Sequence, residues 1–183
     1  MNLFAVSFKF LSLLGAFATI GSLLAMAFLL LDEEGKLSTS GEKLRTFLKC
    51  ASATWFVGSI GSIIFTLAQI LNSSLSVALD ATVIRSFITQ ITLGQYMAIQ
   101  VVIAASVLIS AFRAKKILSL ITLLIVSIVG LVAPVFQSHA ASSGSHSLVI
   151  GSLVIHVVGL SMWVGGILAI AMLSQTDRPI AVP

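Results

Sequence analysis

Five long apolar stretches constrain this chain more than any other feature, because about 18 or more apolar residues in a row can cross a bilayer. They cover residues 10–31, 50–71, 94–112, 117–136 and 148–173. In lipid each stretch must be helical, since only a helix satisfies all its backbone polar groups within one segment. The sequence therefore predicts an all-α fold. We expect a polytopic membrane helix bundle with about five transmembrane helices, forming a single domain over residues 1–183.

The composition agrees with a membrane location and excludes a soluble domain. Only 9% of the 183 residues are charged, whereas a soluble globular domain has about 25%. The net charge of +4 does not indicate nucleic-acid binding, because the ten Lys and Arg residues are dispersed and form no basic patch. The single cysteine, Cys50, cannot form an internal disulfide.

The basic residues also predict an orientation. Eight of the ten Lys and Arg residues fall in the connections 32–49 and 113–116 and in the C-terminal tail. Basic residues are enriched on the cytoplasmic side of membrane proteins. The N-terminus is therefore predicted outside and the C-terminus inside, an alternation that fits five spans.

The outer segment 75–91 has its own pattern. Its apolar residues recur every four positions, at Leu75, Leu79, Val83, Phe87 and Ile91. This spacing predicts a short amphipathic helix lying on the bundle or on the membrane surface. We favour the interpretation that this helix packs on the bundle as a cap over the interpretation that it binds a partner.

All three histidines lie near the C-terminal end, and they are the candidate functional residues. His139 and His146 fall in the last outer connection, 137–147. His156 lies within the fifth span, roughly 12 Å along the helix from Leu148. An ionisable residue at that depth is costly and is expected to face the bundle interior. The alternative for His156 is a neutral histidine bonded to a nearby backbone carbonyl or hydroxyl.

Helical spacing divides the fifth span into two faces. The first face carries His156, Gly159, Trp163 and Gly166. The second is a stripe of small residues, Ser161, Gly165 and Ala169, suited to close contact with another helix.

Imidazole groups are good ligands for copper, zinc, iron and nickel. His139 and His146 are seven residues apart in a Gly- and Ser-rich stretch, so they can converge on one ion. The methionines Met97, Met162 and Met172 could bind Cu(I), although packing is the commoner role of methionine in such helices.

The motif from His139 to Gly166 resembles the copper resistance protein D (CopD) family. The residues that carry the resemblance are His139-Ala140, His146, Leu153 to His156, and Ser161-Met-Trp-Val-Gly-Gly166. The match looks closest to the actinobacterial form, in which a CopD-like region is joined to a cytochrome c oxidase assembly region. The resemblance implies His139, His146 and His156 as copper ligands, and Trp163, Gly165 and Gly166 as the motif that shapes the helix.

The resemblance also implies a location and partners. It points to the bacterial cytoplasmic membrane, with copper bound at the outer face and moved inward. The expected partners are the lipid bilayer, the copper ion, and a periplasmic copper-binding protein or an oxidase assembly factor. CopD-like proteins continue with further spans, whereas this chain ends at Pro183. We therefore expect it to be truncated relative to the family.

Two alternatives stay open at this point. The chain could be a non-transporting assembly or scaffold subunit, for example in oxidase maturation, because few polar residues lie within its spans. It could also be a haem-binding subunit, although a bis-histidine haem needs two facing helix-borne histidines and only His156 lies within a span. We do not expect an enzyme, because no span carries a carboxylate and serines without a base are not nucleophiles.

Overall fold

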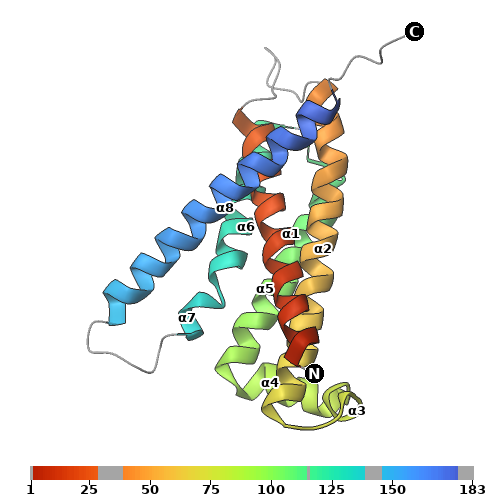
Figure 1. Cartoon of the computed structure of the whole chain (residues 1–183), viewed down its shortest axis with the longest axis vertical. Coiled ribbons are helices and arrows are strands. Elements are labelled where there is room, and N and C mark those ends of the chain that lie inside the picture. The colour runs from red at the N-terminus through yellow and green to blue at the C-terminus, as the bar shows by residue number, and fades with distance from the viewer. Residues whose placement is uncertain (1, 29–38, 115, 139–145, 177–183) are drawn as a thin grey trace.

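The computed structural model describes residues 2–28, 39–114, 116–138 and 146–176, which form helices joined by short turns and contain no β-strand (Figure 1). The helices are α1 (Asn2–Phe28), α2 (Thr39–Ile70), α3 (Leu75–Ala78), α4 (Ala81–Gln90), α5 (Thr92–Ala111), α6 (Ile117–Val132), α7 (Val135–Ser138) and α8 (His146–Thr176). The long helices pack side by side, so the predicted all-α bundle is confirmed.

The predicted spans correspond to helices of unequal length. Within the described residues, four helices are long and apolar enough to cross a membrane: Leu3–Phe28, Ser40–Ile70, Thr92–Ala111 and Leu148–Ser174. The predicted stretch 117–136 forms the shorter α6, whose 16 residues extend about 24 Å. Pro134 follows its end, and proline removes a backbone donor and clashes with the preceding turn. The number of spans and their orientation remain predictions.

Helix α1 lies between α2, α6 and α8 and forms the centre of the bundle. Small residues bring α1 and α2 close together. A Cβ added to Gly15 would collide with the backbone of Trp55, and one added to Gly58 would lie 2.8 Å from the Cα of Ser12. The hydroxyls of Ser12 and Ser59 share a hydrogen bond of 2.9 Å across this interface. Close backbone approach of this kind is how helices associate in lipid.

Part of the predicted connection 32–49 is helical, because α2 begins at Thr39. The first turns of α2 are charged and are stabilised locally. The Arg45 guanidinium lies 2.9 Å from the Glu42 carboxylate, and the Lys49 ammonium lies 4.7 Å from the centre of the Phe112 ring, a cation–π distance. The helix therefore extends beyond its apolar stretch.

The segment 75–91, predicted to be one amphipathic helix, is two helices. Helix α3 ends at Ala78, and Asp80 then caps α4 by accepting hydrogen bonds from the backbone N–H groups of Thr82 (2.8 Å) and Val83 (3.2 Å). An aspartate with these bonds starts a new helix and interrupts the old one. Phe87 is buried, whereas Leu79 is 52% exposed, so the four-residue stripe is not one continuous buried face.

Candidate functional site

The structure places the three candidate histidines differently. His139 lies outside the described residues. His146 is the first residue of α8, where the backbone is described and the side chain is not. His156 lies ten residues farther along α8, about 15 Å from His146 along the axis. Among the residues that the structure describes, no three His, Cys, Asp or Glu side chains gather as a metal site.

The expectation that His156 faces the bundle interior is wrong. Its side chain is exposed and lines a shallow groove on α8 with Ser152 and Leu153. Helix α8 packs through its small residues instead: Ser161 and Ala169 are fully buried, and a Cβ on Gly165 would collide with the Phe17 carbonyl of α1. His156 is nine residues from Gly165, which at 3.6 residues per turn puts it about 180° away. Packing of the small stripe therefore turns His156 outward.

The residues that share a face with His156 are also unpartnered within the described chain. We call this surface the open face of α8: His156, Gly159, Trp163 and Gly166. Trp163 is 68% exposed, and a Cβ added at Gly159 or Gly166 would meet nothing within 4 Å. Figure 1 shows α8 slanting away from α1 toward its His146 end. Of the predicted motif residues, Gly165 is therefore packed against α1, whereas Trp163 and Gly166 lie on the open face of α8.

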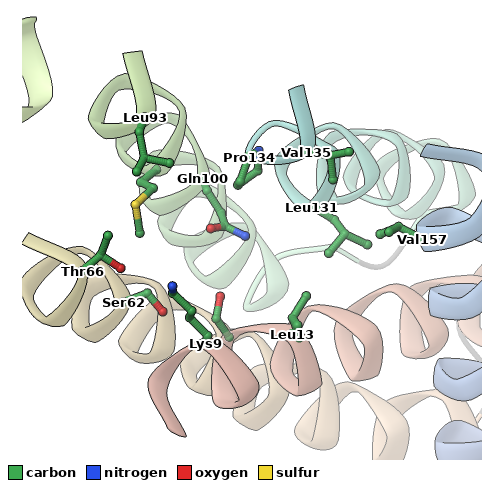
Figure 2. Close-up of a pocket in the computed structure, with 12 residues that line it drawn as sticks. Lys9, Leu13, Ser62, Thr66, Leu93, Gln100, Leu131, Pro134, Val135 and Val157 are labelled. Carbon is green, nitrogen blue, oxygen red and sulfur yellow. The ribbon is translucent and has the colours of Figure 1, made fainter. Parts of the chain in front are cut away.

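A cavity of about 300 Å³ lies between α1, α2, α5, α6, α7 and α8, and the sequence did not predict it as a site (Figure 2). The polar side chains in its wall are Lys9, Ser12, Ser62, Thr66 and Gln100. Ser62, Thr66 and Gln100 are buried, and the hydroxyls of Ser62 and Thr66 have no hydrogen-bond partner. Ser62 and Thr66 are four residues apart, so both hydroxyls lie on one face of α2. This spacing was the signal in the sequence that could have revealed these two residues.

A comparison with protein families completes this description. Residues 1–148 match the family described as copper resistance protein D-like, N-terminal domain. The chain belongs to this family. The match covers α1 to α7 and the start of α8, and so includes His139 and His146. His156 and the rest of α8 lie beyond the matched residues. No curated protein and no solved structure matches the chain.

Membership in the copper resistance protein D-like family fits the membrane bundle described above. The match ends at residue 148, so the family assignment rests on the helices before α8 and not on the motif within it. The resemblance carried by His156, Trp163, Gly165 and Gly166 is thus a separate observation from the family match.

Proposed function

We propose that this protein binds copper through His139 and His146 and carries it across the bacterial cytoplasmic membrane. The observation that carries the proposal is the family match over residues 1–148, which includes both of these histidines. Copper is the substrate in this proposal, and the protein acts as a binding and transfer protein rather than an enzyme.

Histidine chemistry supports the choice of metal. Neutral imidazole is a good ligand for copper, and the described residues offer no competing cluster of carboxylates or thiols. His146 begins α8, and His156 lies on the same helix with an exposed side chain. An ion collected near His146 would therefore meet His156 next along the helix. A periplasmic copper-binding protein would deliver the ion to this end.

Copper content and uptake test the proposal. Cells producing the His139→Ala, His146→Ala, His156→Ala triple variant should accumulate less copper than wild type, as measured by plasma mass spectrometry. Purified triple variant should bind no copper, and His156→Ala alone should weaken binding by about tenfold or more, as loss of a supporting group at a metal site does. Ser152→Ala, which alters the same groove without removing an imidazole, is the matched control. Equal copper content and uptake in wild type and triple variant would refute the proposal.

One observation favours a second function. The open face of α8 has no partner in the described chain, as expected for a subunit that docks on another membrane protein, such as an oxidase assembly factor. Here the protein would support assembly without moving copper. Co-purification of an oxidase assembly factor that is lost on Trp163→Ala, with copper uptake unchanged in the triple histidine variant, would favour this scaffold role.

A further inference from the structure

We infer that the cavity lined by α1, α2 and α5 to α8 binds a small amphiphile with a single carboxylate head, such as a medium-chain fatty acid. This ligand is distinct from copper and goes beyond the proposed function. The inference rests on unpartnered hydroxyls, one ammonium group and a division of the cavity into a polar and an apolar end.

The hydroxyls of Ser62 and Thr66 are the first observation. Ser62 is 4% and Thr66 is 7% exposed, yet neither hydroxyl has a hydrogen-bond partner. A buried unpaired hydroxyl costs free energy. Serines and threonines in membrane helices usually avoid that cost by bonding to the carbonyl four residues earlier. Ser22, Ser52 and Thr122 do so here, with distances of 2.7, 2.8 and 2.8 Å. Ser62 and Thr66 do not, so their donors remain available to a ligand.

The charge at the cavity is the second observation. Lys9 is the only charged residue in its wall among the residues that the structure describes. It lies on α1 about 10 Å from the start of the helix at Asn2, and its long side chain can keep the ammonium at the mouth. Among the described residues, the wall contains no carboxylate, histidine or cysteine, and Met97 is its one candidate copper ligand. A copper ion would therefore meet a repelling ammonium and a single thioether. An anion is the complementary ligand.

The shape of the cavity is the third observation. Figure 2 shows the ends of the Lys9, Ser62, Thr66 and Gln100 side chains gathered on one side, where Leu93 also lies, and only apolar side chains such as Leu131 and Val157 on the other. A molecule that fills the cavity therefore needs a polar head and an apolar body. The volume of about 300 Å³ is at the lower limit of small-molecule sites, which span roughly 300–1,000 Å³. That size fits a short chain better than a whole lipid.

The head group follows from the donors. The ammonium of Lys9 supplies only donors, the hydroxyls of Ser62 and Thr66 can each donate one proton, and the amide of Gln100 can donate two. A carboxylate accepts such bonds through two oxygens and carries one negative charge, which one lysine balances. A phosphate monoester carries about −1.5 to −2 and would leave charge uncompensated beside one ammonium.

Binding of radiolabelled octanoate to the purified full chain in a non-ionic detergent tests this inference, with octanol and octyl phosphate as competitors. Octanoate should bind, and octanol should compete poorly. Lys9→Met should weaken octanoate binding by about tenfold or more, because it removes a charge-assisted hydrogen bond. Lys43→Met is the matched control, since Lys43 is exposed on α2 and does not line the cavity.

The threonine variants separate a ligand site from a packing defect. Thr66→Val should weaken octanoate binding by about three- to tenfold while the ligand-free protein unfolds at the same temperature or higher, because an unpaired hydroxyl is removed. Thr19 is the matched control: its hydroxyl is also buried and unpartnered, but it does not line the cavity. Thr19→Val should leave octanoate binding unchanged.

Three results would overturn the inference. The first is equal competition by octanol, which would mean that the cavity accepts any apolar chain. The second is unchanged octanoate binding in both Lys9→Met and Thr66→Val. The third is tighter binding of octyl phosphate than of octanoate, which would replace the carboxylate with a phosphate head.

Discussion

The interface between α1 and α2 and the open face of α8 both lie in apolar surroundings, but they are built from different residues. At the α1–α2 interface, Gly15 and Gly58 let the backbones approach, and Trp55 is completely buried. On the open face, Trp163 is 68% exposed and Gly166 has open space beside it. Hydrophobicity alone cannot separate these surfaces, because lipid tails are as apolar as leucine.

The difference shows what holds this bundle together. Helices associate in lipid through close van der Waals contact, so small residues in register matter more than apolar area. Helix α8 contains both kinds of surface, with the stripe of Ser161, Gly165 and Ala169 against α1 and the open face on the other side. The open face therefore contributes little to the stability of the described chain, and its histidine and tryptophan remain available to a ligand or a partner.

The two tryptophans give the largest contrast. Trp55→Ala should destabilise the protein by about 3–5 kcal/mol, because it empties a large volume in the core. Trp163→Ala should change stability by less than about 0.5 kcal/mol, since lipid or detergent replaces the lost ring. Unfolding by dodecyl sulfate in mixed micelles, followed by circular dichroism, measures both. Equal losses in the two variants would mean that the open face is covered by protein.

Two adjacent glycines give the next contrast. Gly165→Ala should cost about 1–3 kcal/mol, because the new methyl group collides with backbone atoms of α1. Gly166→Ala, with the same chemical change one residue later, meets nothing and should stabilise the helix by up to about 1 kcal/mol. The same mixed-micelle titration compares them. A destabilising Gly166→Ala would indicate a partner on the open face.

The sequence predicted the bundle well because length and apolarity alone require helices in lipid. It also identified the small stripe of α8 from spacing. His156 was predicted to face the bundle interior because its depth along the span was taken to imply burial. The packing of Gly165 on α1 instead decides which way the histidine points.

Two other features depended on tertiary structure. The break at Asp80 required recognising an aspartate cap inside an apparently continuous four-residue pattern. The cavity is formed by side chains from several helices, and in the sequence Lys9 and Gln100 stand only as isolated polar residues beside or within apolar stretches. A single sequence gives no indication that these residues meet, because their separation along the chain carries no distance information.

The smallest predicted effect concerns the start of α4, where hydrogen bonds to a carboxylate stabilise the first turn in addition to the packing of Phe87. Hydrogen bonds from the backbone N–H groups of Val83 and Thr82 hold the pKa of Asp80 below its usual value of 3.8. A lowered pKa means that the folded state favours the ionised carboxylate. Its contribution is fully present above 3.8 and is lost as the pH falls through the lower, folded-state value.

Hydrogen exchange of the α4 amides, measured by mass spectrometry, should therefore show this helix opening more readily in acid, after correction for the intrinsic pH dependence of exchange. Asp80→Asn keeps a good capping side chain without a titrating group, so protection of α4 in this variant should no longer depend on pH in that range. Asp80→Ala should lower protection at every pH, while the amides of α1 stay protected in all three proteins. An Asp80→Asn variant that loses protection in acid as wild type does would show that another group controls α4. The start of α4 would then still depend on charge, unlike the α1–α2 interface, but not on the charge of Asp80.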